Sequence, residues 1–205
     1  MAARRALFAP LSGGLAGRAG LFTGTTRWIE RFDERAERAI APLRGKKVAD
    51  RVFYTASSLG EFSLIWVALA LLRALRGGRV NERAARRALL GTGVEFLFVN
   101  GLVKSLVGRK RPLQTIEHPL AFRQPLTSSF PSGHATAAFC AATLLGERDV
   151  AAPCYFAAAV VISTSRLYVR IHHASDVIGG ALIGLGLGRV LRRIMPIEPS
   201  RPGAT

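Results

Sequence analysis

The chain has 205 residues, 49% of them hydrophobic, and its 29 Lys and Arg against 13 Asp and Glu give a net charge of +16. So large a basic excess usually suggests nucleic acid as a partner, but the apolar residues are concentrated in blocks, which favours a membrane protein and argues against a nucleic-acid-binding one. The two cysteines are too few for a disulfide framework or a thiolate zinc site. The length fits one domain.

The N-terminal residues are expected to precede the membrane-spanning part. Residues 1–26 are rich in Gly, Ala and Arg and are predicted to form a flexible arm. In residues 27–47 apolar side chains recur at helical spacing, while Glu and Arg occupy the other face. This pattern indicates an amphipathic helix that lies in the membrane interface or packs on the protein's own surface.

Five apolar stretches follow, at residues 52–72, 88–103, 130–146, 150–165 and 177–191. The first holds one charged residue, Glu61. At about 1.5 Å per residue its length matches the roughly 30 Å hydrocarbon core of a bilayer, so it is predicted to be a transmembrane helix. The other stretches are shorter and are expected to extend into their polar flanks within a bundle.

The last stretch carries Gly180, Gly184 and Gly188 on one helical face, which predicts close packing against another helix. The whole pattern predicts an all-α, polytopic transmembrane helix bundle over residues 48–195, with about five spans. Residues 196–205 are expected to form a disordered tail.

Three polar segments lie at the ends of these apolar stretches. Burying charged groups there costs free energy, so their presence indicates a functional site. The segments contain Lys104 and Arg111-Pro112; Pro131-Ser132-Gly133-His134; and Ser165-Arg166, His172 and Asp176. Five spans would bring all three segments to one face of the membrane. We therefore expect them to form one site.

The residue types in these segments suit a phosphate. Lys104, Arg111 and Arg166 offer cationic donors for the three equatorial oxygens of a transferring phosphoryl group. Ser132 and Gly133 precede an expected helix, so their backbone N–H groups and the serine hydroxyl would face an anion at its N-terminus. We expect these five residues to bind the phosphate.

His172 and Asp176 are four residues apart, which places them side by side on a helical turn. Asp176 can then hold one imidazole N–H and leave the other nitrogen of His172 free to attack phosphorus. His173 could also reach Asp176.

In order and spacing, the three segments match the signature of the type 2 phosphatidic acid phosphatase superfamily, which the chain resembles over residues 52–191. The resemblance implies a covalent phosphohistidine on His172. It also implies that His134 protonates the departing alkoxide and then activates water. The family spacing selects His172 over His173, which is interpreted as structural. Neither a metal nor another cofactor is expected, because Asp176, the one carboxylate in the segments, is assigned to His172.

Other polar residues near the expected site have less specific interpretations. Arg109 and Lys110 are interpreted as a juxtamembrane cluster that contacts anionic headgroups. Glu61 and Glu95 are intramembrane acids that either line a substrate cleft or make a structural contact.

The expected substrate is a lipid-linked phosphate monoester or diphosphate, whose tail stays in the bilayer while its phosphate enters the basic site. Within the family, the polyprenyl type is favoured, such as decaprenyl-phosphoryl phosphoribose or a polyprenyl diphosphate. Phosphatidic acid and phosphatidylglycerol phosphate are the alternative. The loop at residues 113–129, which holds Phe122 and a surface His118, is expected to help select the substrate, and Tyr168 and Arg170 are interpreted as headgroup contacts. Membrane lipids are the only other partners expected, and the oligomeric state is open.

Two other classes are weighed against this one. A vanadium-dependent haloperoxidase has a related anion pocket, but its soluble character conflicts with five apolar spans. A non-enzymatic protein that binds anionic lipid explains the charge but not His134, His172 and Asp176. The sequence thus predicts an integral enzyme of a bacterial inner membrane, with the face that holds its active site left open.

Overall fold

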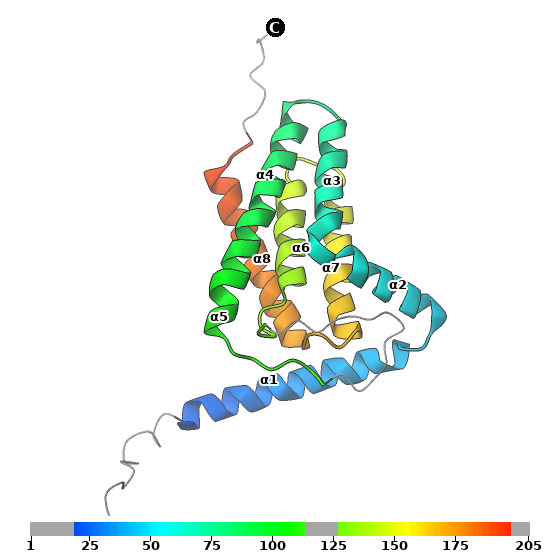
Figure 1. The fold of residues 1–205 in the computed structure, drawn as a ribbon, viewed down its shortest axis with the longest axis vertical. Coiled ribbons are helices and arrows are strands. Elements are labelled where there is room, and N and C mark those ends of the chain that lie inside the picture. Colours follow the sequence, from blue (N-terminus) through cyan, green and yellow to red (C-terminus); the bar gives the residue numbers. More distant parts are fainter. Residues whose placement is uncertain (1–18, 114–126, 198–205) are drawn as a thin grey trace, which may run out of the picture.

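The computed structural model describes residues 19–113 and 127–197, and these residues form helices and connecting turns without any strand (Figure 1). The helices are α1 (Ala19–Ile40), α2 (Lys47–Leu59), α3 (Leu64–Leu75), α4 (Arg79–Phe96), α5 (Lys104–Leu106), α6 (Gly133–Leu145), α7 (Ala152–Tyr168) and α8 (Ala174–Ile194). Three short helical turns join them: η1 (Ala41–Leu43), η2 (Glu61–Ser63) and the π-helical η3 (Leu97–Val103). The prediction of an all-α fold is confirmed.

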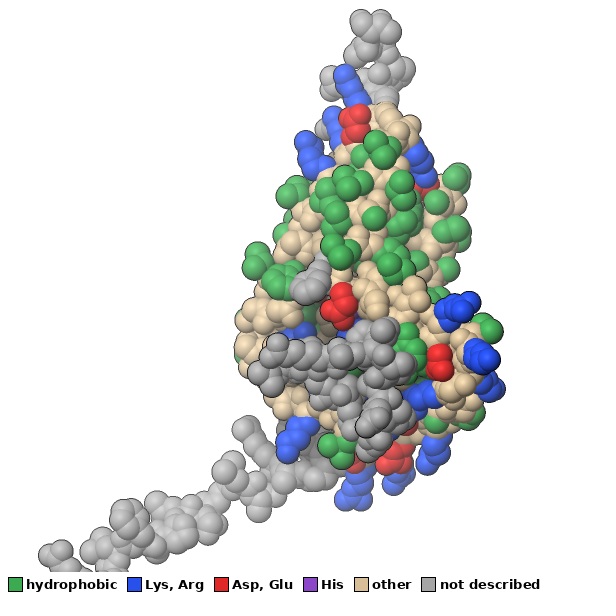
Figure 2. All heavy atoms as spheres, turned by 45° about the vertical axis from the view of Figure 1, so that its right-hand side comes forward, with side chains coloured by type: hydrophobic (Ala, Val, Ile, Leu, Met, Phe, Trp, Pro, Cys, Tyr) green, Lys and Arg blue, Asp and Glu red, His purple; other side chains and the backbone are tan. Residues whose placement is uncertain are grey.

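The bundle has the length and composition of a membrane protein. Among the described residues, Arg79–Leu106 and Ala174–Ile194 are long and apolar enough to cross a bilayer, and α2 with α3 would add a third span if the bent pair is one. Figure 2 shows hydrophobic side chains gathered between ends that carry Lys and Arg. The polytopic bundle is thus confirmed, while the count of five spans stays a prediction.

The prediction of one continuous helix over residues 52–72 is wrong, because α2 ends at Leu59 and α3 begins at Leu64. The chain bends by 76° between α2 and α3, at Gly60 and η2. Ser63 lies at a φ of 58°, a left-handed conformation that is uncommon for a residue with a side chain. Hydropathy measures how apolar a segment is, and it does not report where a helix bends.

The helix at the N-terminus is longer than predicted at its start. It begins at Ala19 rather than at residue 27, so residues 19–26 are helical instead of part of a flexible arm. It ends at Ile40 and continues as η1 to Leu43. Figure 1 shows it crossing the end of the bundle where α8 begins. The rest of the predicted arm and the tail from residue 198 lie outside the described residues.

The centre of the bundle is α6, which is packed closely by α8. A Cβ added at Gly180 would lie 2.6 Å from the Ser132 carbonyl oxygen, and one at Gly188 would lie 2.7 Å from the Thr143 Cβ. A Cβ at Gly184 would collide with the Thr136 carbonyl. The glycine face thus packs closely on α6, as expected, and this contact fixes the start of α6 beside the start of α8.

Gly184→Ala is expected to destabilise the protein by about 1–3 kcal/mol, because the new methyl group overpacks the α6 contact. The matched control is Gly186→Ala on the same helix, where an added Cβ meets nothing within 4 Å. The control should be neutral or gain up to about 1 kcal/mol of helix propensity. Thermal unfolding in detergent measures both, and equal midpoints would contradict this packing.

Candidate active site

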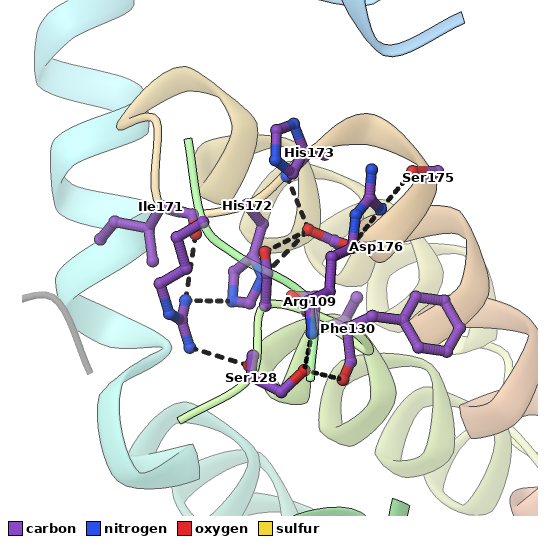
Figure 3. Close-up of polar contacts among 12 residues, drawn as sticks. Arg109, Ser128, Phe130, Ile171, His172, His173, Ser175 and Asp176 are labelled. Atoms are coloured by element: carbon purple, nitrogen blue, oxygen red, sulfur yellow. Dashed lines mark hydrogen bonds and ion pairs between the residues drawn. The ribbon is translucent and has the colours of Figure 1, made fainter. Parts of the chain in front are cut away.

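The three polar segments meet at one end of the bundle. Lys104 begins α5, Gly133 begins α6, and Asp176 lies in the first turn of α8. The contacts between segments are close: Arg111 Nη1 lies 3.2 Å from His172 Nε2, and the Ser132 N–H donates to the Asp176 carbonyl at 3.0 Å. Figure 3 shows His172 and Asp176 pointing toward one another at the turn before α8.

His172 has its two ring nitrogens in different surroundings. The ring is buried, and its Nδ1 lies 3.7 Å from Asp176 Oδ2. Its Nε2 lies on the side of Arg111. The backbone N–H of His172 donates to the Arg166 carbonyl at 3.2 Å, which fixes the turn between α7 and α8. A carboxylate therefore faces one nitrogen, and a cation that can hold a phosphate faces the other.

The Asp176 carboxylate is fully buried and is held from several sides. The Ser129 hydroxyl donates to Oδ2, and the His173 backbone N–H donates to the same oxygen at 2.8 Å. Arg109 Nη1 lies 2.5 Å from Oδ1. His173 thus contacts Asp176 through its backbone, in keeping with a structural role.

Arg109 does not have the headgroup contact expected for it. Its guanidinium pairs with Asp176, donates to the Ser175 hydroxyl at 2.7 Å and pairs with Asp33 of α1 at 2.7 Å. Asp33 also accepts from the Ser175 backbone N–H at 2.8 Å. Sequence reasoning missed Asp33, because a buried Asp in an amphipathic helix looks like any other residue of its polar face.

The expected phosphate-binding residues line the same end of the bundle. The Arg166 side chain is buried and donates to the Ser57 hydroxyl, while Lys104 Nζ donates to Asn100 Oδ1 at 2.9 Å. A Cβ at Gly133 would lie 3.5 Å from Lys104 Nζ.

Ser132 differs from its expectation in one respect. Its hydroxyl accepts from the Ala135 N–H at 3.4 Å and so caps α6, but its own backbone N–H is engaged by Asp176 rather than free for an anion. The Ser132 N–H therefore positions the two motif segments against each other.

Glu61 lies at the site, a placement that hydropathy did not reveal. Its Oε1 is 3.7 Å from His134 Nε2 and 3.5 Å from Arg166 Nη1. Glu95 is instead buried within α4.

Tyr168 is not placed as the expected headgroup contact would be, whereas Arg170 lines the cavity beside His172. Tyr168 is buried, and its hydroxyl donates to the Leu43 carbonyl at 3.0 Å and to Asp50. Arg170 pairs with Glu37 of α1 at 3.3 Å. The part of the selectivity loop at residues 114–126, with His118 and Phe122, lies outside the described residues.

A cavity of about 370 Å³ lies beside His172, between α1 and the turn that joins α7 to α8. Its lining is acidic on the side of α1 and includes Glu30, Asp33, Glu34, Glu37, Arg109, Arg170 and His173. It offers room for a polar group next to the candidate nucleophile.

Burial lowers the pKa of His172 to about 4, although the Asp176 carboxylate acts in the opposite direction. The neighbouring Arg111 and Arg166 lower this pKa further. The ring is therefore neutral near pH 7, and a nitrogen lone pair is available.

The His172 ring should titrate near pH 4 in the folded protein. Carbon-13 NMR of labelled histidines, with His172→Ala to assign the signal, measures the midpoint. Because an unfolded histidine takes up its proton near pH 6.5, the folded state should lose stability as the pH falls from about 6.5 toward 4. A midpoint near 6.5 in the folded protein would contradict the buried, neutral ring.

Arg109→Ala should lower kcat for nitrophenyl phosphate hydrolysis by about 10²-fold, because Asp176 loses the cation that fixes it beside His172. The neighbouring Lys110 is exposed, so Lys110→Ala is the matched control and should change kcat little. Equal losses in the two variants would mean that the contact with Asp176 has no part in the reaction.

Comparison with known proteins places this arrangement in a family. Residues 85–199 match the family model described as PAP2 superfamily. The chain is 33% identical over 141 residues to the decaprenylphosphoryl-5-phosphoribose phosphatase of Mycobacterium tuberculosis, covering 66% of this chain and 74% of the relative. It is 34% identical over 131 residues to the protein of the same name from Mycolicibacterium smegmatis, covering 60% and 67%.

Two crystal structures share the fold. The transmembrane PAP2 type phosphatidylglycerolphosphate phosphatase from Bacillus subtilis aligns with a TM-score of 0.63 and 23% identity, covering 81% of this chain and 85% of that one. Aquifex aeolicus LpxE aligns with a TM-score of 0.61 and 28% identity, covering 77% and 92%. Because the family model matches more than half of the sequence and includes all three polar segments, the chain belongs to the PAP2 superfamily of membrane phosphatases.

Proposed function

We propose that this protein hydrolyses a lipid-linked phosphate through a covalent phosphohistidine on His172. The observation that carries the proposal is the pair of contacts made by this ring. Nδ1 faces the Asp176 carboxylate, and Nε2 lies 3.2 Å from Arg111 at the end of the bundle where Lys104 and Arg166 also lie. A neutral imidazole held in this way presents its lone pair to a bound phosphate.

In the first half of the proposed reaction, His172 Nε2 forms a bond to phosphorus while the bond to the leaving oxygen breaks. His134 gives its proton to that oxygen, so the lipid leaves as an alcohol. Asp176 stays ionised and stabilises the positive charge on the His172 ring. Lys104 and Arg166 balance the charge on the equatorial oxygens.

In the second half, His134 takes a proton from water as the water oxygen attacks phosphorus. The bond from phosphorus to Nε2 then breaks, and inorganic phosphate and neutral His172 are formed. The proton given in the first half is thus recovered in the second, and His134 ends as it began.

We propose that the chemistry proceeds without a metal. Three cationic side chains can take the role that Mg²⁺ has in other phosphoryl transfers. The Asp176 carboxylate is already engaged, because it pairs with Arg109 and accepts hydrogen bonds from the Ser129 hydroxyl and the His173 backbone N–H.

A polyprenyl-phosphoryl sugar phosphate is the substrate that we favour. The two mycobacterial relatives are named for decaprenylphosphoryl-5-phosphoribose, and they are more similar to this chain than the Bacillus phosphatidylglycerolphosphate phosphatase is. The acidic cavity beside His172 adds independent support, because carboxylates accept hydrogen bonds from sugar hydroxyls. Phosphatidic acid and phosphatidylglycerol phosphate remain the alternative. A bacterial inner membrane is the location that these bacterial relatives support.

Phosphate release from a panel of lipids tests this proposal. The detergent-solubilised protein should hydrolyse decaprenylphosphoryl-5-phosphoribose faster than phosphatidic acid or phosphatidylglycerol phosphate, and a chelator should leave the rate intact. His172→Ala should abolish turnover. A strict Mg²⁺ requirement, or near-normal turnover by purified His172→Ala, would overturn the mechanism, and a protein without any catalytic release would be a lipid-binding scaffold instead.

A further inference from the structure

We infer that Glu61 is a positioning residue for His134, and that the bend between α2 and α3 exists to bring it there. The inference rests on the proposed function, because it assigns a partner to the general acid of that reaction. Glu61 lies outside the three polar segments, in a stretch whose apolar character predicts a plain membrane span.

The geometry around Glu61 is specific. Its Oε1 lies 3.7 Å from His134 Nε2 and 3.5 Å from Arg166 Nη1. Among the described residues, His134 Nε2 is buried and has no hydrogen-bond partner. The Glu61 side chain is 41% exposed, whereas that of Arg166 is 3% exposed. A small movement of a partly exposed carboxylate would therefore close a hydrogen bond to a buried nitrogen that needs one.

The backbone at this point is fitted to the His134 ring. A Cβ at Gly60 would lie 2.8 Å from His134 Cδ2 and 2.9 Å from Ile162 Cγ2, so only glycine lets the chain approach this closely. The turn that follows holds Ser63 at a φ of 58°. A non-glycine residue in the left-handed region of backbone conformation costs free energy, and such residues cluster at functional sites. The bend thus places the Glu61 carboxylate beside the ring.

The chemistry gives this contact a purpose. A carboxylate beside the Nε2–H fixes the orientation of the His134 ring in both of its protonation states. The Nδ1–H of the imidazolium then faces the leaving oxygen, and once that proton has been given, the Nδ1 lone pair faces water. The carboxylate also stabilises the imidazolium that forms when His134 takes a proton from water. Each histidine of the site then has its own carboxylate: Asp176 for His172, and Glu61 for His134.

The test compares two phosphate esters in the full-length protein. Nitrophenolate is a good leaving group that needs little help from a general acid, whereas the alcohol of a lipid phosphate needs it strongly. Glu61→Gln should therefore slow single-turnover phosphorylation by the lipid phosphate about 10–100-fold, and by nitrophenyl phosphate less than about threefold. The quantity compared is the ratio of the phosphorylation rate with the lipid phosphate to the rate with nitrophenyl phosphate. Glu61→Asp keeps the negative charge, so this ratio should lie between those of Glu61→Gln and wild type. Glu82→Gln, an exposed acid on α4, is the matched control and should leave the ratio unchanged.

A double-mutant comparison identifies the partner of Glu61. If Glu61 acts through His134, Glu61→Gln should add little further loss in a His134→Ala background. Equal losses on both esters would mean that Glu61 serves Arg166 and phosphate binding, and an unchanged ratio would leave it without a role. Either result, in Glu61→Gln or in Glu61→Asp, overturns the inference. Failure of the proposed function has a different signature, because wild type would then release no phosphate or His172→Ala would keep its activity.

Discussion

The buried negative charge of Asp176 is the constraint on which the rest of the site depends. A carboxylate without any exposed surface costs several kcal/mol unless it is paired and hydrogen-bonded. Its partners are Arg109, Ser129 and the backbone N–H of His173, and these lie before α6 and at the start of α8. Because one carboxylate binds all three groups, the polar segments that carry the chemistry are fixed relative to each other. The same carboxylate faces His172 Nδ1 and so orients that ring.

The pairing of Asp176 also connects the N-terminal helix α1 to the site. Arg109 pairs with Asp176 on one side and with Asp33 of α1 on the other, and Ser175 at the start of α8 also donates to Asp33. The sequence suggests that α1 is an accessory helix beside the phosphatase domain. In the structure, its buried carboxylate, Asp33, is linked to the candidate nucleophile through Arg109 and Asp176, and its other acids line the cavity next to His172.

Much of the fold follows from local pattern. Apolar stretches place α6, α7 and α8 within a few residues, and the spacing of Gly180 and Gly184 identifies the face of α8 that packs on α6. The position of three polar segments at helix ends is enough to predict that they converge. The bend at Gly60, the pairing of Arg109 and the approach of Glu61 to His134 could not be predicted in this way. Each depends on a partner far away in sequence, and neither hydropathy nor spacing reports such a partner.

The covalent intermediate is the central claim, and trapping it is the most direct test. His134→Ala should be phosphorylated by nitrophenyl phosphate, which needs little acid help, but should hydrolyse the intermediate slowly, because the water lacks its base. With labelled phosphate and a basic quench within the first turnover, the account predicts label that accumulates on His172 and is absent from the His134→Ala, His172→Ala double variant. Product formation without any protein-bound label, or label that persists in the double variant, would contradict it.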